Sequence, residues 1–351
     1  MAAYSAGVND PLAVKLWSRK LMREALAQTF MSKYMGESSS SAIQIQNDTK
    51  KSAGDRITIG LRMQLSGAGV QGDGTLEGLE EALQTYSDNI FINQLRHAVR
   101  SGGKMSEQRV PFSVREEART GLQDWWSDRM DQSIINQLTG NTGQTDTRYT
   151  GNQATIAPVY SSTAASNRWV FSGASTTEAS LSTTEIMSLA VIDKCVTTAK
   201  TSVPLMRPIM VDGKEMYVLM LHPHQIYSLR TNTNTGQWLD IQMAAMTGGK
   251  VSDNPIFTGA MGVYNNVVIV ETRRIPTVVA NTRRGVFFGA QACGFAVGQD
   301  SAPEKMTWVE ELFDYENQLG VSAGMIFGAK KIVYNSLDFG TLAVSTYATA
   351  P

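Results

Sequence analysis

Three histidines and two cysteines are the residues of this chain whose chemistry could support metal binding or nucleophilic catalysis. His222 and His224 flank Pro223, but a metal site needs a third ligand, and none is evident in the sequence around them. We interpret this pair as the turn that enters a helix, with proline at its first position. His97 lies beside an expected strand. The histidines therefore predict no metal site.

The other reactive side chains also favour structural roles. Cys195 and Cys293 lie far apart and match no metal-binding or redox spacing, so we expect two buried thiols in a reducing cytosol. Glu310 and Glu311 are adjacent in an alternating, strand-like sequence, which should point their carboxylates to opposite faces. The sequence alone does not exclude an active site assembled from distant residues, but no feature requires one. We therefore expect neither enzymatic activity nor a cofactor or metal.

A glycine-rich, acidic segment, residues 64–84, invites comparison with phosphate-binding and calcium-binding loops. It lacks the G-x-x-x-x-G-K-[ST] pattern, and acids such as Glu77, Glu80 and Glu81 would repel a phosphate. Its oxygen-bearing side chains do not recur at the alternating positions of a calcium-binding loop. We therefore expect a flexible connection.

The sequence on either side of this connection is strand-like. Apolar residues occupy every second position of Arg56–Met63, and a similar stretch lies within Asp88–Val99. Together they predict a β-hairpin that projects from its own core. Because such an arm buries little surface within one chain, we expect another copy of the protein to cover it.

Residues 1–54 predict an N-terminal arm. A helix start at Asp10 precedes Val14, Trp17 and Leu21, which fall on one side of a helix. This helix could bind a membrane surface or act as a transit peptide, or it could pack on a neighbouring subunit. We favour packing, because a polar tether follows where a targeting helix would have a cleavage region. We expect no secretory signal, and the sequence has no run of roughly 20 apolar residues that could span a membrane.

The strongest helical pattern covers Arg115–Leu138 and should end at Gly140. Its aromatic pair, Trp125 and Trp126, could form a ligand-stacking platform, but aromatic residues at helical spacing are far more often core. We interpret this element as a long spine helix. Residues 141–182, rich in Thr, Asn, Ser and Gly, predict a long and partly ordered surface excursion.

A second globular unit is expected after this excursion. Ser182 and Glu185 form a capping-box pattern that should open a helix. The apolar runs Tyr217–Leu221, Val267–Val270 and Gly285–Gly289 predict buried strands. Because helices alternate with strands, this unit is predicted to be α/β in character.

Composition limits the function classes. The chain has 351 residues, of which 42% are hydrophobic, so it can form a substantial core. A net charge of −1 argues against a dedicated nucleic-acid binder, which needs a basic patch.

Several local segments carry a resemblance to a known family. They are residues 65–73 with Leu76–Glu81, Asn254–Gly262 leading into Val267–Val270, Gly289–Ala292, Asp314–Gln318 and Ile326–Gly328. These segments, and the order of the predicted elements, resemble the major capsid proteins of tailed double-stranded-DNA bacteriophages, in particular their N4-like group. The resemblance covers roughly residues 40 to 340; the tract 141–182 has no counterpart that we can place.

The resemblance implies an α+β chain with the tailed-phage major capsid (Johnson) fold. The implied divisions are an N-terminal arm (1–54), an extended hairpin loop (55–112), a peripheral domain with the spine helix (113–182), an α/β axial domain (183–293), and closing peripheral strands with the C-terminal tail (294–351).

The function implied by the resemblance is structural. The subunit would be made in the bacterial cytoplasm and would assemble with itself into the pentamers and hexamers of an icosahedral virion shell. Its other partners would be portal, scaffolding and cement proteins, and packaged double-stranded DNA through non-specific contacts, with no membrane partner. The alternatives are an encapsulin-like cellular shell protein and a turn-rich, surface-active hydrolase.

Two further expectations concern contacts between subunits. Val14, Trp17 and Leu21 should pack on a neighbour. The acids Glu77, Glu80 and Glu81 should meet arginines of an adjacent copy, for which the candidates are Arg273, Arg274, Arg283 and Arg284. Some capsids of this fold also join a loop lysine to a neighbour's asparagine. Residues 64–103 contain no lysine, and we expect Lys50, Lys51 and Lys104 near the hairpin base, so no such link is predicted.

Overall fold

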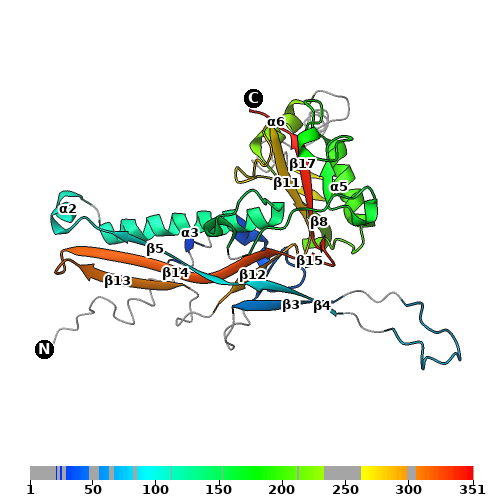
Figure 1. The fold of residues 1–351 in the computed structure, drawn as a ribbon, viewed down its shortest axis with the longest axis horizontal. Coiled ribbons are helices and arrows are strands. Elements are labelled where there is room, and N and C mark those ends of the chain that lie inside the picture. Colours follow the sequence, from blue (N-terminus) through cyan, green and yellow to red (C-terminus); the bar gives the residue numbers. More distant parts are fainter. Residues whose placement is uncertain are drawn as a thin grey trace.

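A 26-residue helix, α3 (Val114–Thr139), runs along a six-stranded sheet, and a second, upright unit stands at one end of it (Figure 1). The computed structural model describes residues 21, 24–25, 29–46, 55–62, 67–81, 85–111, 113–151, 153–211, 213–232, 262–298 and 306–350. We call α3 with its sheet the spine unit and the upright part the α/β unit.

Helix α3 confirms the predicted spine helix. Its buried stripe includes Leu122, Trp126 and Met130, which face the sheet. The helix ends at Gly140, whose φ of 62° places it in the left-handed region. A Cβ atom added there would lie 2.5 Å from the carbonyl oxygen of Ile156, so only glycine fits this helix end.

The sheet of the spine unit is centred on β14 (Gln318–Lys331). One edge of β14 pairs antiparallel with β5 (Asn93–Arg100), and the other pairs with β13 (Thr307–Phe313) and β12 (Cys293–Val297). Beyond β12 lie β2 (Ile43–Gln46) and β1 (Met35–Gly36). The short elements around it are the 3-10 helix η1 (Phe30–Tyr34), α2 (Lys104–Arg109), β15 (Val333–Tyr334) and β16 (Leu337–Asp338).

The predicted hairpin is confirmed. β3 (Arg56–Arg62) pairs antiparallel with β4 (Thr85–Phe91), and Arg56 lies opposite Phe91 in the register. Its base is anchored by Ile57, Ile59 and Ile90, which form a small core with residues of the spine unit and its following loop. The returning strand ends at Phe91, and β5 is a separate strand of the sheet.

The α/β unit has a seven-stranded sheet of order β6-β17-β11-β8-β10-β9, with β7 also pairing with β8. The strands are β6 (Trp169–Phe171), β17 (Thr341–Tyr347), β11 (Thr282–Phe288), β8 (Lys214–Leu221), β10 (Val267–Glu271), β9 (Val263–Tyr264) and β7 (Ile209–Val211). Helices α5 (Leu189–Thr201) and α6 (Pro223–Thr231) belong to the same unit. The three buried strands predicted in this unit are confirmed as β8, β10 and β11.

The tract 141–182 is more ordered than the sequence predicted. It contains α4 (Thr147–Thr150), η3 (Ala164–Ser166), η4 (Glu178–Ser180) and strand β6, which pairs parallel with β17 in the α/β sheet. The view of this tract as a surface excursion was therefore wrong. β17 likewise joins the α/β sheet, although its residues lie in the range 294–351 that we expected to close the spine unit.

The helix predicted to open at Ser182 begins later, because the Ser182–Glu185 pattern closes a turn and not the first turn of a helix. Helix α5 begins at Leu189, with Ser188 as its N-cap residue. The Glu185 carboxylate instead accepts hydrogen bonds from the backbone amides of Ser182 (2.8 Å) and Ser175 (3.2 Å), and so stabilises the preceding loop. Within the described ranges, no helix is both long and apolar enough to cross a membrane.

Candidate assembly surfaces

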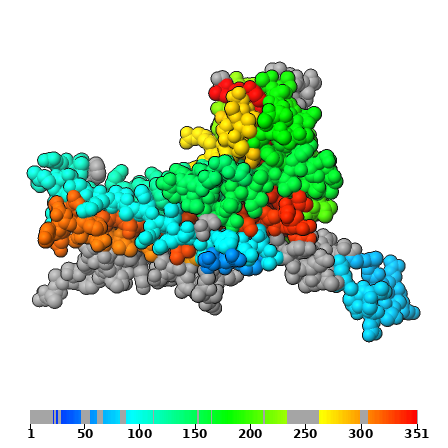
Figure 2. All heavy atoms as spheres, in the orientation of Figure 1, coloured from blue at the N-terminus to red at the C-terminus, as the bar shows by residue number. Residues whose placement is uncertain are grey.

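The hairpin tip, residues 67–81, forms a lobe that projects beyond the rest of the chain (Figure 2). Two leucines on it are largely exposed, Leu76 at 56% and Leu79 at 69%. They are held in one turn, because the Leu79 amide donates to the Leu76 carbonyl oxygen at 3.0 Å. Two apolar side chains so exposed on a projecting loop are typical of a surface that a partner covers.

The predicted acids lie on the same tip, and all three are exposed. The Glu80 carboxylate accepts a hydrogen bond from the Gly78 amide at 2.7 Å, and that of Glu81 accepts one from the Gly67 amide at 2.6 Å. Glu80 and Glu81 therefore shape the loop in addition to charging it. The tip presents leucines next to carboxylates, a surface that fits an apolar and basic partner.

The structure separates the four arginines proposed as partners of these acids. Arg284 is buried and paired with Glu178 in its own chain, so its assignment to the hairpin was wrong. Arg274 is also paired internally, with Asp128 at 2.9 Å. Arg283 is half-buried and donates to the Thr282 carbonyl oxygen. Arg273 is exposed and remains a candidate.

Of the three arm residues predicted to contact a neighbour, the structure describes only one. Val14 and Trp17 lie outside the described residues. Leu21 is fully buried in the cluster that contains Leu122 and Trp126 of the spine helix. Its expected contact with a neighbour was therefore wrong, because the chain's own core covers it.

The chain just after Leu21 is anchored to the spine helix. The Asp131 carboxylate accepts hydrogen bonds from the backbone amides of Phe30 (3.0 Å) and Met31 (2.9 Å), and Glu24 lies 3.6 Å from Arg119. An arm that reaches a neighbour must therefore lie N-terminal to this anchored segment.

The face of the sheet opposite α3 carries a groove of about 260 Å³. On β13, Trp308 and Glu310 point towards the helix, where the Arg115 guanidinium lies 2.6 Å from the Glu310 carboxylate. Val309 and Phe313 therefore lie on the other face, and the Arg100 guanidinium stacks over the Phe313 ring at 4.4 Å. This groove offers an apolar floor with a cation beside it.

The predicted helix-entry turn at His222 and the two predicted buried thiols are confirmed. His222 is the N-cap residue of α6, and its Nδ1 accepts a hydrogen bond from the His224 amide at 3.2 Å. Both cysteines are free and buried, and burial raises the pKa of both thiols, that of Cys293 to about 12. Among the described residues, no group of three or more His, Cys, Asp or Glu side chains could hold a metal ion.

The remaining residues with candidate chemistry are structural. His97 stacks on the Trp125 ring with centroids 4.4 Å apart, and Trp126 is buried in the core, so the aromatic pair is packing. Glu310 and Glu311 point to opposite faces, as predicted.

Lys104 does not lie at the hairpin base, contrary to expectation. Strand β5 carries the chain away from the hairpin to the far end of the sheet, where Lys104 begins α2 (Figure 1). There the Lys104 backbone amide donates to the Asn317 carbonyl oxygen at 3.1 Å. Lys50 and Lys51 lie outside the described residues.

A long helix on a sheet, a projecting hairpin and an α/β unit together define a shell-forming subunit of the tailed-phage type, and comparison with known proteins agrees. The family model described as phage capsid protein matches residues 5–350. The chain is 30% identical to the major capsid protein of Pseudomonas phage KPP25, over 94% of this chain and 93% of that protein.

Solved structures give the same result. The capsid of Ralstonia phage GP4 is similar with a TM-score of 0.76 and 31% identity, over 100% of this chain and 99% of that one. The cyanophage Pam1 capsid shares the fold with a TM-score of 0.72 at 20% identity, over 100% and 97% of the two chains. The chain belongs to the phage capsid protein family, and it is a major capsid subunit of an icosahedral virion shell.

Proposed function

We propose that this subunit forms the pentamers and hexamers of its shell through the hairpin tip. The supporting observation is the tip itself, where Leu76 and Leu79 are exposed on a loop that projects from the body of the chain. In this arrangement the α/β unit lies near each symmetry axis, the spine unit lies at the periphery, and the hairpin lies over an adjacent subunit. Val14 and Trp17 of the arm contact another neighbour.

The shell is stabilised by repetition. Burying one leucine fully is worth about 1.5–3 kcal/mol, and a subunit that both gives and receives a hairpin takes part in two such contacts. Losing one subunit then requires breaking several contacts at once, which makes the whole more stable than any single interface.

The expected partners other than further copies of the subunit follow from its role in the shell and from its net charge. Portal and scaffolding proteins, and cement proteins where a shell uses them, are expected to bind the assembled lattice. Packaged double-stranded DNA is expected to touch the shell non-specifically, because a net charge of −1 provides little counterion release. We expect no catalytic activity.

The test is a double variant, Leu76→Ser with Leu79→Ser. The subunit should fold normally, since both side chains are exposed, but particle yield in negative-stain microscopy should fall sharply. The matched control replaces two exposed apolar residues of the α/β unit, Val203→Ser with Leu205→Ser, and should assemble better than the tip variant. Normal particles from the tip variant would show that the hairpin contact is not needed.

A further inference from the structure

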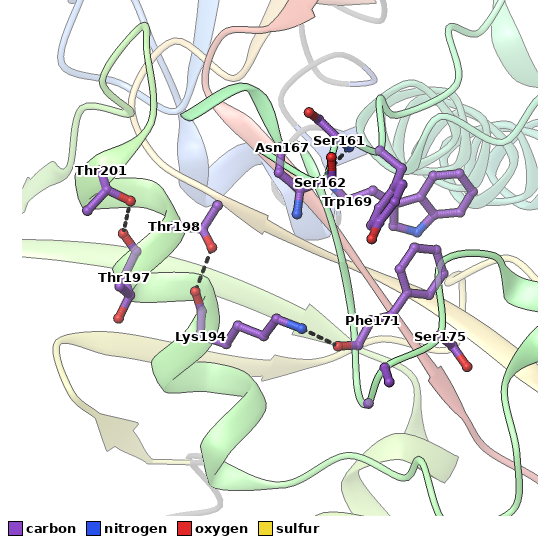
Figure 3. Close-up of a pocket in the computed structure, with 13 residues that line it drawn as sticks. Ser161, Ser162, Asn167, Trp169, Phe171, Ser175, Lys194, Thr197, Thr198 and Thr201 are labelled. Carbon is purple, nitrogen blue, oxygen red and sulfur yellow. Dashed lines mark hydrogen bonds between the residues drawn. The ribbon is translucent and has the colours of Figure 1, made fainter. Parts of the chain in front are cut away.

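A pocket of about 510 Å³ lies in the α/β unit between helix α5 and residues 160–175 of the tract 141–182 (Figure 3). Its volume falls in the range of roughly 300–1,000 Å³ that is typical of small-molecule sites. The tract is the part of the chain that the sequence resemblance could not place, and in the structure its strand β6 joins the α/β sheet beside this pocket.

One wall of the pocket is aromatic and rigid. Tyr160, 40% exposed, meets the Phe171 ring edge-on at 5.7 Å, and Trp169 lies 5.0 Å from Phe171. Trp169 is fixed by a 2.8 Å hydrogen bond from its Nε1 to the Ser345 hydroxyl and by the Arg284 guanidinium stacked over its ring. A wall fixed in this way loses little conformational entropy when a ligand binds.

The opposite wall supplies hydrogen-bond acceptors. The hydroxyls of Thr197, Thr198 and Thr201 each donate to the carbonyl oxygen four residues earlier in α5, at 2.8–2.9 Å. Because each hydroxyl proton is used within the helix, the oxygen lone pairs remain available to a ligand's O–H groups.

Asn167 supplies donors. Its Oδ1 accepts hydrogen bonds from the backbone amides of Ser161 (3.3 Å) and Trp169 (3.1 Å), which fixes the orientation of the side-chain amide. Figure 3 shows the amide nitrogen turned towards the space between Thr198 and Trp169. Its two N–H groups can therefore donate to a ligand oxygen.

The charge of the pocket selects against ions. Lys194 is the one charged residue among the described residues that line it, and its ammonium group already donates to the Phe171 carbonyl oxygen at 3.2 Å. No described carboxylate lines the pocket to bind a cation, and no second cation strengthens anion binding. The ligand that fits is uncharged, with an apolar face for the aromatic rings and several hydroxyls for the polar side chains.

We propose that this pocket binds an uncharged saccharide. The C–H face of a sugar ring packs on Tyr160 and Trp169, where the partly positive C–H groups meet the electron-rich ring faces. Its hydroxyls donate to the threonines of α5 and accept from Asn167. This activity goes beyond shell formation.

The test uses assembled particles of the full-length chain and three probes, maltose, cellobiose and N,N′-diacetylchitobiose, at millimolar concentration. Saturation-transfer NMR should show transfer from the protein to the ring protons of at least one probe. Tyr160→Ala should weaken its binding by about tenfold, the loss expected when an aromatic stacking contact is removed. Tyr227→Ala removes a tyrosine of similar exposure (49%) on α6, away from the pocket, and should bind as the wild type does.

If Tyr160→Ala does not form particles, a second variant tests binding in the pocket. Asn167→Asp keeps the oxygen that accepts from the Ser161 and Trp169 amides but loses both side-chain N–H donors, so it should also weaken binding. The proposal is overturned if no probe binds wild-type particles, whether the pocket rejects the sugars or a neighbouring copy fills it. It is also overturned if the pocket variants bind as tightly as Tyr227→Ala.

Discussion

Arg284 and Glu178 form a bidentate ion pair inside the α/β unit, with both nitrogen–oxygen distances at 2.7 Å and each side chain only 4% exposed. The third guanidinium nitrogen of Arg284 donates to the Gly140 carbonyl oxygen at 2.8 Å, at the end of the spine helix. One side chain therefore connects the tract 141–182, strand β11 and helix α3. This contact therefore adds a polar link between the α/β unit and the end of the spine helix to the apolar cluster that the two share.

Glu178→Gln should destabilise the subunit strongly. The amide keeps the shape of the carboxylate, but Arg284 is then buried without a counter-ion, which costs about 3–5 kcal/mol. Urea unfolding of unassembled subunits would show the midpoint moving to lower concentration. The control is Asp146→Asn, which breaks the more exposed pair with Arg148 and should shift the midpoint little. Equal midpoints for the two variants would contradict the importance of the buried pair.

This ion pair also shows why part of the molecule was not predictable from sequence. Glu178 and Arg284 are 106 residues apart, and neither lies in a local pattern that indicates the other. Without that pairing, the tract 141–182 has the polar composition of a surface loop, and Arg284 is indistinguishable from the exposed Arg273. Local rules correctly describe this tract as polar. Only the long-range pairing with Arg284 explains why its Glu178 is buried.

His222 should make folding stability depend on pH. Burial, the Arg283 guanidinium and His224 lower the pKa of His222 to about 4, from an ordinary value of 6.5. Between these two values the unfolded chain binds a proton at this site that the folded chain does not, so stability falls as the pH drops through that window and is fully present above 6.5. Thermal unfolding of unassembled subunits from pH 4 to 7 measures this slope.

The matched variant for this prediction is His222→Asn. Asparagine also caps helix N-termini but does not titrate, so the slope between pH 4 and 6.5 should decrease. Tyr227→Phe, on the same helix, should keep the wild-type slope. An unchanged slope in His222→Asn would assign the pH dependence to other groups.

Leu21 marks the boundary between core and arm. Leu21→Ala should lower the free energy of unfolding of the unassembled subunit by about 2–5 kcal/mol, because it leaves a cavity beside the spine helix. Deleting residues 1–20 should instead leave a folded subunit that forms few particles, since that segment carries Val14 and Trp17. Urea titration of both proteins, with particle counts, separates the two effects. If the truncated chain unfolds, residues 1–20 belong to the core of the subunit and not to an arm.

The elements that sequence predicted best are those whose signals are local. The spine helix was predicted to within a residue at each end, because its apolar stripe and Gly140 are contained in one stretch of chain. The hairpin was predicted from two alternating stretches and the glycine-rich connection between them, which are also local signals. Strands β6 and β17 were assigned to the wrong unit, because their pairing joins residues about 175 positions apart. Lys104 was misplaced because alternation through Asp88–Val99 cannot show that the chain leaves the hairpin at Phe91.

The acids of the hairpin tip can be tested by charge reversal. The triple variant Glu77→Lys, Glu80→Lys and Glu81→Lys should impair assembly, because like charges would then meet at the interface with a basic neighbour. Since Glu80 and Glu81 also accept backbone hydrogen bonds, the control is the triple glutamine variant, which keeps an acceptor oxygen at each position. Microscopy should show a much larger loss of particles for lysine than for glutamine. Equal particle yields from the lysine and glutamine variants would show that these carboxylates do not meet a basic neighbour at the interface.

We predict that the mature shell contains no covalent links between subunits. A lysine–asparagine bond requires an amine on the hairpin, and residues 64–103 contain none. Lys330, near the hairpin base, has its ammonium group paired with Asp88 and bonded to the Asn89 carbonyl oxygen. Lys104 lies at the far end of the spine unit.

Disulfide links are equally disfavoured. Cys195 and Cys293 are buried, and burial raises the pKa of both thiols, so the reactive thiolate is scarce at neutral pH. Purified particles boiled in denaturant without reductant should therefore run as one monomer band near 38.2 kDa. A ladder of dimers to hexamers that persists with reductant would indicate an isopeptide link, and Lys104→Arg would then test whether its amine reaches a neighbour. A ladder that disappears with reductant would instead show that a cysteine becomes exposed in the shell.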